Sequence, residues 1–365
     1  MSKVYFTDMR TSFRENLPKK LTRLIDRAGL GTIDFDHKFV AIKIHFGELG
    51  NMAYLRPQYA RALAAYIKER GGIPFLTDCN TLYVGSRKNA PEHIETAYIN
   101  GYTPYATGCQ VIIADGIKGA DEAYIPIDCE EVKTAKIGRA IADADIIISL
   151  SHFKGHEEAG FGGALKNLGM GSGSRAGKME MHYDGKPVVD HDRCRGCHMC
   201  ASICANNGIH YENGKAVIDH SHCVGCGRCI AICNFDAIRP DNSSSEASLN
   251  RRIAEYAYAV VKDKPNFHIN IAVDISPNCD CHSENDAAII PNIGMFASFD
   301  PVAVDLAAAD AANAMPANPR SALGEAECRC HDHFTNVHPN TNWRVQIEHG
   351  EKIGLGSSKY ELIRI

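Results

Sequence analysis

The chain has 365 residues, a length that predicts two or three domains and a large apolar core. Charged residues make up 23% of the chain and its formal net charge is −5 at pH 7, so neither nucleic acid nor an anionic membrane is favoured as a partner. The first residues lack the apolar run of a signal peptide, and stretches such as 146–150 are too short to span a bilayer, so we expect a cytoplasmic protein.

The first half of the chain alternates strand and helix patterns. Apolar and β-branched runs predict strands at 38–44, 73–77, 111–114, 124–127 and 144–151. Helices are predicted at 57–70, 91–100 and 137–142. This alternation predicts an α/β body, with a mostly parallel sheet and helices on both faces.

Polar side chains follow three of these strands. Sites in parallel sheets lie beyond the carboxyl ends of the strands, where His45, Asp78 and His152 fall. We therefore expect these three residues near one site, with His45 and His152 binding a cofactor.

A glycine-rich loop follows the strand at 144–151. Gly162 and Gly163 precede a helix-like segment, so their backbone N–H groups are expected to point at an anion. Lys166 adds a cation whose pKa we expect to be lowered by crowding or burial, and His156 and His182 lie nearby in the sequence. This pattern predicts a small-molecule ligand, or a phosphate-bearing or metal-bearing cofactor, with His156, Lys166 and His182 as catalytic residues; the alternative is an ordinary anion-binding loop. The spacing fits neither a P-loop nor a dinucleotide fingerprint.

Two compressed cysteine quartets dominate residues 183–240. Each quartet reads Cys-x-x-Cys-x-x-Cys-x-x-x-Cys. The first three cysteines at this spacing wrap a short loop around three corners of an iron–sulfur cube, and the fourth cysteine of each run faces the other cube. The predicted ligands of cluster I are Cys194, Cys197, Cys200 and Cys233, and those of cluster II are Cys223, Cys226, Cys229 and Cys204. Zinc ribbons use two separated pairs instead, and disulfides need an oxidising compartment. The seven remaining cysteines are an odd number, which argues against a disulfide framework.

An internal repeat supports this interpretation, because residues 184–194 recur as 213–223. Each copy reads as an Asx-Gly turn, a short apolar strand and a cysteine loop. The pattern resembles the bacterial two-cluster ferredoxins, although Ala205 and Asn234 stand where that family usually has proline. The resemblance implies two [4Fe-4S] clusters, single-electron transfer and a redox partner protein.

The α/β pattern resumes after a polar linker at 241–245. Helices are predicted at 247–262 and 301–314, and strands at 267–275 and 293–298. We therefore expect an α/β body whose two parts, 1–182 and 241–365, are interrupted by an α+β ferredoxin-like insertion at 183–240.

A further cysteine pair lies in the second part of the body. Cys279 and Cys281, followed by His282, can both reach a metal on one side of an extended chain, which makes a further metal site possible. The alternative is a pair of buried thiols. We interpret a similar run from Cys328 to His333 as incidental.

Several of these motifs resemble a known family over nearly the whole chain. They are His152-x-x-x-His156, Gly162-Gly163-Ala-Leu-Lys166-Asn167, Ser174 to His182, Asn278 to Cys281, and Asp300 to Asp305. Together they resemble the DUF362 family of iron–sulfur centre proteins. His156, Lys166 and His182 are also similar to residues in the catalytic domain of lactate racemase, where a lysine and histidines hold a nickel-pincer nucleotide. That similarity implies that Lys166 links the cofactor and that the two histidines are ligands or bases.

Three functions follow from these observations. The first is an oxidoreductase or activation factor that passes single electrons between a redox partner and a site in the α/β body. The second is a plain electron carrier whose body is a docking surface, which predicts no pocket. The third is a lactate-racemase-like enzyme with accessory clusters.

Overall fold

An eight-stranded sheet forms the centre of the α/β body. The structure, a computed structural model, describes residues 1–365 except 83–84, 184–185, 224, 241–245 and 327–329. The strands of the sheet, in spatial order, are β16 (Tyr360–Arg364), β1 (Ser2–Asp8), β15 (Gly294–Ser298), β14 (Asn266–Ala272), β7 (Ile146–His152), β2 (Phe39–Lys43), β3 (Ile73–Asp78) and β4 (Gln110–Ile113). Five of the seven pairings are parallel, and β15 runs antiparallel to both of its neighbours. The predicted α/β class with a mostly parallel sheet is confirmed.

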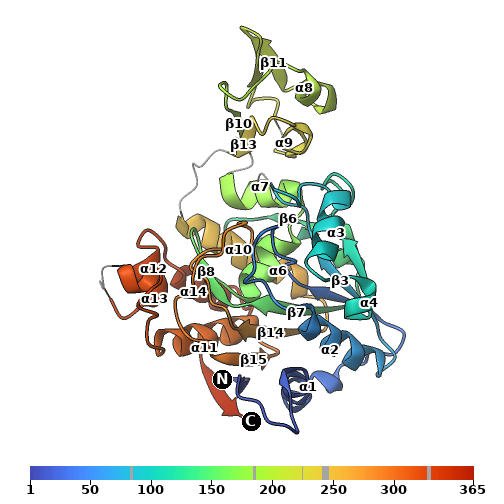
Figure 1. The fold of residues 1–365 in the computed structure, drawn as a ribbon. Helices are drawn as coiled ribbons and strands as arrows, with labels where there is room; N and C mark the ends of the chain where they lie inside the picture. The colour runs from blue at the N-terminus through green and yellow to red at the C-terminus, as the bar shows by residue number, and fades with distance from the viewer. Residues whose placement is uncertain (83–84, 184–185, 224, 241–245, 327–329) are drawn as a thin grey trace.

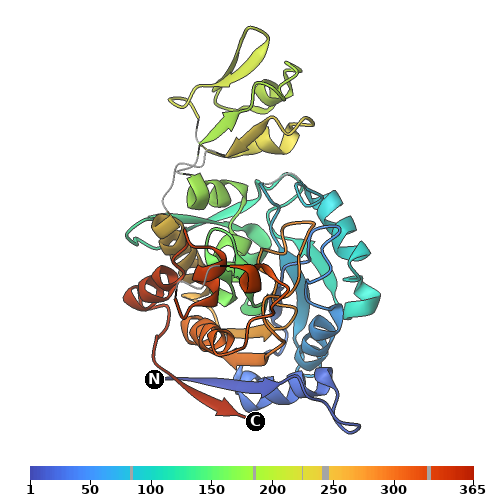
Figure 2. The same ribbon diagram turned by 60° about the vertical axis from the view of Figure 1, so that its left-hand side comes forward.

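Helices cover both faces of this sheet (Figures 1 and 2). Alternate side chains of each central strand point to opposite faces, so Val40 and Ile42 enter one apolar core while Ala41 enters the other. The first core is closed by α1 (Leu17–Arg27), α2 (Pro57–Lys68) and α3 (Ala90–Ile99). The second is closed by α6 (Ala164–Ser172), α10 (Glu246–Val261), α11 (Pro301–Asn313) and α14 (Arg344–Lys352). Among the described residues, no helix is long and apolar enough to cross a membrane.

Some local predictions differ from the structure. The strand expected at 124–127 is β5 (Glu122–Pro126), which pairs with β6 (Thr134–Gly138) in a separate hairpin. The helix expected at 137–142 is shortened to α5 (Arg139–Asp143), because β6 takes its first residues. The terminal strands β1 and β16, which pair with each other at the sheet edge, were not predicted. The remaining short elements of the body are η1 (Leu30–Thr32), α4 (Pro104–Thr107), β8 (Lys154–His156), β9 (Gly160–Gly162), α12 (Ala322–Glu325) and α13 (His333–Val337).

Residues 187–240 form a separate small unit at the end of the molecule opposite the two termini (Figures 1 and 2). The unit contains β10 (Pro187–Val189) paired with β13 (Ile238–Pro240), β11 (Ile209–Glu212) paired with β12 (Lys215–Ile218), and the short helices α8 (Met199–Ile203) and α9 (Arg228–Ile232). Its two halves repeat each other. His198 (φ 63°) and Gly227 (φ 64°) precede the two helices, and Cys204 and Cys233 end them with the same ψ of 104°.

One helix of the body, α7 (Arg175–Tyr183), lies beneath this unit (Figure 1). Met179 of α7 and Leu82 join the apolar cluster of the unit. Lys88 of the body also forms an ion pair with Asp236 of the unit at 2.7 Å. These contacts tie the cysteine-rich unit to the α/β body.

A buried carboxylate holds the start of α6. Asp305 Oδ1 accepts a hydrogen bond from the backbone N–H of Ala164 at 2.6 Å, and Oδ2 accepts one from Leu165 at 2.9 Å. Asn270 Nδ2 donates to the same carboxylate at 2.6 Å. A Cβ on Gly163 would lie 2.3 Å from Asp305 Oδ1, so the carboxylate can approach the helix only because this residue is glycine. Asp305 therefore occupies the N–H groups of Ala164 and Leu165, while an anion at the N–H groups of Gly162 and Gly163 stays a prediction.

We expect Asp305→Ala to lower the free energy of unfolding by at least about 3 kcal/mol. The substitution leaves three buried donors without an acceptor, and each such donor costs roughly 1–3 kcal/mol. Asn89→Ala is the matched control, because Asn89 caps α3 from the surface and its loss costs about 1 kcal/mol. Anaerobic urea unfolding measures both values, and equal losses in the two variants would contradict this role of Asp305.

Candidate functional site

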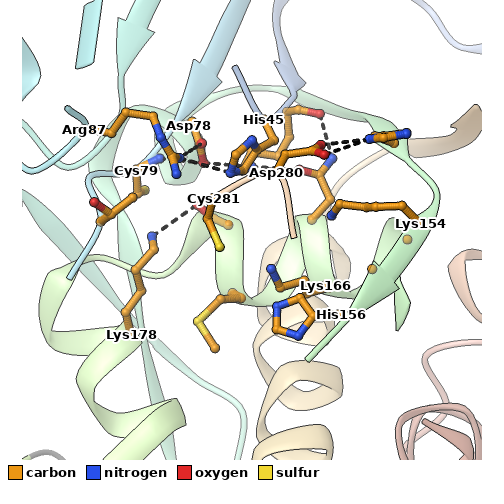
Figure 3. A pocket seen from close by; sticks show the side chains of 18 of the residues that line it. His45, Asp78, Cys79, Arg87, Lys154, His156, Lys166, Lys178, Asp280 and Cys281 are labelled. Atoms are coloured by element: carbon orange, nitrogen blue, oxygen red, sulfur yellow. Dashed lines mark hydrogen bonds and ion pairs between the residues drawn. The ribbon is translucent and has the colours of Figure 1, made fainter. Parts of the chain in front are cut away.

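A cavity of about 670 Å³ opens beyond the carboxyl ends of β2, β3 and β7 (Figure 3). Its ionisable lining residues are Lys43, His45, Asp78, Cys79, Arg87, His152, Lys154, His156, Lys166, Lys178, His182, Asp280 and Cys281. Five lysine or arginine side chains thus face two carboxylates. A cavity with this excess of cationic side chains is suited to an anionic ligand.

The structure brings the predicted site residues together. The cavity is lined by His45, His152, His156, Gly162, Gly163, Lys166, His182 and Cys281. Cys279 joins the same group through its contact with Lys166. Five further lining residues had no predicted role: Lys43, Arg87, Lys154, Lys178 and Asp280. Lys154 and Asp280 could have been found from their places between paired histidines and paired cysteines, whereas Lys43 and Arg87 carry no such signal.

An ion pair anchors the floor of the cavity. Lys43 Nζ lies 2.9 Å from Asp78 Oδ1 and donates to Asn167 Oδ1 at 2.8 Å. Burial lowers the pKa of Lys43, and the nearby Asp78 partly offsets that effect. Burial alone would raise the pKa of Asp78, but Lys43 and the surrounding cations hold it below its usual value. Asp78 is therefore a fixed counter-charge.

Arg87 links this floor to His45, as the labelled side chains in Figure 3 show. Its Nε pairs with Glu48 at 3.0 Å, and its Nη1 lies 3.0 Å from His45 Nε2. The N–H of Gly47 donates to the other ring nitrogen of His45. Burial and the Arg87 charge lower the pKa of His45 to about 3, so this imidazole is neutral near pH 7. Among the described residues, Arg87 Nη2 is buried without a hydrogen-bond partner.

His152 is held by two contacts within the protein, and its contact with a cofactor stays a prediction. Its Nδ1 bonds the Asp280 carboxylate at 2.8 Å, and its Nε2 bonds the carbonyl oxygen of Val273 at 2.7 Å. Both ring nitrogens are therefore used within the protein. Because Asp280 lies between the two cysteines, this ion pair fixes the loop that carries Cys279 and Cys281.

Cys279 is the centre of a second charged group. Lys166 Nζ lies 3.1 Å from Cys279 Sγ. A hydrogen bond from Cys281, with the charges of Lys166 and Lys154, overcomes burial and lowers the pKa of Cys279 well below its ordinary value. The Cys279 thiolate and burial raise the pKa of Cys281 well above its ordinary value. The pair therefore consists of a thiolate at Cys279 and a thiol at Cys281.

The expected lowering of the Lys166 pKa is wrong. Burial does lower it, but the charges of Cys279, Cys281 and Glu157 have the larger combined effect and raise the pKa of Lys166 above its ordinary value. Lys166 is consequently a stable ammonium. His156 supports the same thiolate. Its Nδ1 accepts the backbone N–H groups of Glu158 and Ala159, so the ring proton resides on Nε2, from which the ring hydrogen-bonds Cys279.

Helix α7 connects the cavity with the cysteine-rich unit. Lys178 Nζ donates to the carbonyl oxygen of Gly173 at 2.7 Å, and His182 Nδ1 lies 3.3 Å from the Glu158 carboxylate. At the other end of α7, Arg175 packs against Gly227, where a Cβ would lie 2.8 Å from Arg175 Cγ. One helix thus places side chains in the cavity and against the second cysteine loop.

Two smaller cavities lie within residues 187–240, and each contains one predicted quartet. The cysteines lining the first, of about 310 Å³, are Cys194, Cys197, Cys200 and Cys233. Those lining the second, of about 370 Å³, are Cys204, Cys223, Cys226 and Cys229. Backbone N–H groups donate to the sulfurs of Cys194, Cys204 and Cys233 at 3.3–3.4 Å. In both cavities the fourth cysteine comes from the opposite run.

The remaining cysteine run near the C-terminus is only partly described. Cys328 lies outside the described residues. His333 Nε2 bonds the carbonyl oxygen of Met315 at 2.8 Å, and Cys330 Sγ lies 3.5 Å from the side-chain oxygen of Asn336. These contacts give His333 and Cys330 partners within the protein.

Comparisons with known proteins give a family and two distant structural likenesses. A thylakoid-associated protein of Synechocystis is 28% identical over 144 residues, a match that spans 40% of each chain. The apoprotein of lactate racemase from Thermoanaerobacterium thermosaccharolyticum superposes with a TM-score of 0.38 and 11% identity, over 78% of this chain and 54% of that one. A protein from Thermotoga maritima gives a TM-score of 0.38 and 14% identity, over 83% of this chain and 58% of that one. Superpositions at this level carry no argument about function.

The family match covers the body and the cysteine-rich unit alike. Residues 40–310, which include the cavity residues and both quartets, match the model described as a domain of unknown function, DUF362. The chain therefore belongs to the DUF362 family.

Proposed function

We propose that this protein is an iron–sulfur redox protein. In this proposal two [4Fe-4S] clusters pass electrons one at a time between a partner protein and an anionic ligand in the large cavity. The observation that carries the proposal is the arrangement of the cysteines: each small cavity is lined by one complete crossed quartet, and one of them adjoins the helix that also lines the large cavity.

The donor set of each small cavity fits an iron–sulfur cluster. Four thiolates per cavity are the ligands that such clusters require, and N–H groups directed at sulfur are among the features that tune their potentials. Cys223, Cys226, Cys229 and Cys204 would hold the cluster nearer the body, and Cys194, Cys197, Cys200 and Cys233 would hold the outer one. When bound, each cluster supplies one-electron transfer.

The contacts of α7 support a path for electrons between the cysteine-rich unit and the large cavity. Arg175 lies close enough to Cys226 and Cys229 for their charges to interact, while Lys178 and His182 of the same helix line the large cavity. On the outer quartet, Cys197 is exposed to solvent. We therefore place the partner at the outer quartet and the ligand at the inner end of α7.

The charge pattern of the large cavity supports an anionic ligand. Lys43 is paired with Asp78, Arg87 with Glu48, and Lys166 with Cys279. Among the described residues, the side chain of Lys154 has no hydrogen-bond or ion-pair partner, although its charge acts on Cys279 and Asp280. A buried ammonium without a direct partner favours an anionic ligand such as a phosphate or carboxylate.

The other two expectations differ from this proposal in testable ways. A plain electron carrier requires no ligand cavity, so the presence of a cavity lined by charged side chains counts against this function. A lactate-racemase-like enzyme would use the same cavity, with Lys166 linked to a cofactor. In this structure Lys166 instead donates a hydrogen bond to Cys279. Nickel in protein purified from its own host would favour the racemase-like alternative.

The first prediction concerns cluster content. Anaerobically purified protein should contain about eight irons and about eight acid-labile sulfides per chain. Cys200→Ser and Cys233→Ser should each remove the same cluster, because both line one cavity, whereas Cys204→Ser should remove the other. Electron paramagnetic resonance of the reduced variants distinguishes the two signals. Loss of different signals in the Cys200 and Cys233 variants would rule out crossed ligation.

The second prediction concerns the inner cluster. Arg175→Met removes a buried positive charge near Cys226 and Cys229, so the reduced cluster should become less stable and its potential more negative. If the reduced cluster loses about 1.4 kcal/mol of stability relative to the oxidised cluster, its reduction potential falls by about 59 mV, because one electron is transferred. Arg195→Met is the matched control, because Arg195 is an exposed arginine beside the outer quartet. Redox titration followed by paramagnetic resonance measures both potentials; an unchanged inner potential in Arg175→Met would contradict the proximity of this cluster to the body.

The third prediction concerns the anion. Inorganic phosphate should raise the free energy of unfolding of the wild-type protein, by about 2.7 kcal/mol when the phosphate concentration is one hundred times its dissociation constant. Lys154→Met should remove most of this stabilisation, whereas Lys118→Met, at an exposed position, should retain it. Differential scanning calorimetry at constant ionic strength is the measurement. Equal stabilisation of the two variants would mean that phosphate binds elsewhere.

A further inference from the structure

A loop beside the large cavity gathers three different metal-binding groups. A carboxylate oxygen of Glu157, the sulfur of Cys281 and an imidazole nitrogen of His282 all lie within 4.8 Å of one another. We infer that these residues form a site for one divalent transition-metal ion of the zinc or iron(II) type. This site is separate from the two cysteine quartets, and the inference does not depend on the proposed electron transfer.

The three groups come from two segments that the fold holds together. Glu157 lies in the turn between β8 and β9, while Cys281 and His282 lie in the loop after β14. His282 Nε2 lies 2.9 Å from Glu157 Oε1, and the backbone N–H of Cys279 donates to Glu157 Oε2 at 3.2 Å. The carboxylate is thus already oriented toward the cysteine loop before any metal binds.

Neighbouring residues hold the cysteine loop rigidly. The Asp280 carboxylate is bonded to His152, and its backbone carbonyl accepts the N–H of Glu48 at 2.9 Å. Asn51 Nδ2 donates to the carbonyl oxygen of His282 at 3.0 Å. Residues that fix the orientation of metal ligands in this way are a regular feature of metal sites.

The donor set selects the class of metal. A cysteine ligand must be deprotonated, so metal binding at this site releases the proton of the Cys281 thiol. The resulting thiolate, together with an imidazole, favours zinc, iron(II), cobalt or nickel, whereas magnesium and calcium prefer oxygen ligands only. Three protein ligands leave one coordination position open, which is the pattern of catalytic rather than structural zinc sites. Cys281 also lines the large cavity, so a metal at this site would meet an anionic ligand bound there.

Cys279 is better placed as a supporting residue than as a ligand. Its sulfur accepts a hydrogen bond from Lys166 at 3.1 Å and interacts with His156. Glu157 and His282 are partly exposed, with 31% and 39% of their side chains accessible, so an ion can reach the site from solvent.

The test uses the anaerobic holoprotein and zinc ion alone as the probe. After removal of loosely bound metal, the wild-type protein should bind one equivalent of zinc in addition to its iron. X-ray absorption at the zinc edge should report one sulfur ligand together with nitrogen and oxygen ligands. Cys281→Ser, His282→Gln and Glu157→Gln should each weaken zinc binding by at least about 10–100-fold. Iron and sulfide contents should stay unchanged in all three variants.

Asp263→Asn is the matched control, because Asp263 is 79% exposed and lies outside the ligand set. It should bind zinc as the wild type does. Zinc binding that is unaffected in the three ligand variants, or no uptake by the wild type, would overturn the inference and leave Glu157 and His282 as a simple ion pair. Zinc that appears only as iron is lost would also overturn it, since the zinc would then occupy the quartets. A wild type without iron would refute the proposed function but leave the comparison of these variants valid.

Discussion

A buried cation is stabilised by a counter-charge, and the large cavity gathers five cationic side chains at the end of one sheet. Asp78, Glu48 and the Cys279 thiolate each balance one cation through a direct contact. These contacts join the ends of β2 and β3 to each other and the cysteine loop to α6. Removing one partner would leave an uncompensated charge in the interior, which is costly, so the residues around the cavity are mutually dependent.

Burial and neighbouring charge also explain the protonation states of the individual side chains. The imidazole of His45 faces Arg87 in a buried position, and the pKa of His45 is therefore lowered to about 3. Lys166 is equally buried but faces the Cys279 thiolate, and its pKa is raised. Burial favours the neutral form of both groups, and the neighbouring charge decides whether this effect is reinforced, as at His45, or overcome, as at Lys166.

The sequence predicted those features that depend on local spacing. The two cysteine runs define their cavities because each loop of three cysteines is short, and the repeat of 29 residues fixes the relation between the loops. His45, Asp78 and His152 could be grouped because the carboxyl ends of parallel strands meet at one edge. Lys43 and Arg87 could not be found, since their importance arises only from partners distant in sequence. The contact of His152 with Asp280 and the raised pKa of Lys166 were missed for the same reason: each depends on a contact with the loop at 279–281, more than a hundred residues away. The pairing of β1 with β16 likewise joins opposite ends of the chain and has no local signal.

The turn between β8 and β9 connects the two halves of the site. Glu157 pairs with His282 on the cysteine loop, while the next residue, Glu158, pairs with His182 on α7. His156, just before them, holds the Cys279 thiolate through one nitrogen while its other nitrogen accepts backbone N–H groups of the same turn. Three consecutive side chains therefore reach the helix that carries Arg175, the thiolate bonded to Lys166 and the candidate metal ligands. Because a turn of this length has little freedom when all three side chains are bound, the helix beneath the cysteine-rich unit and the loop beside the cavity are held in one fixed relation.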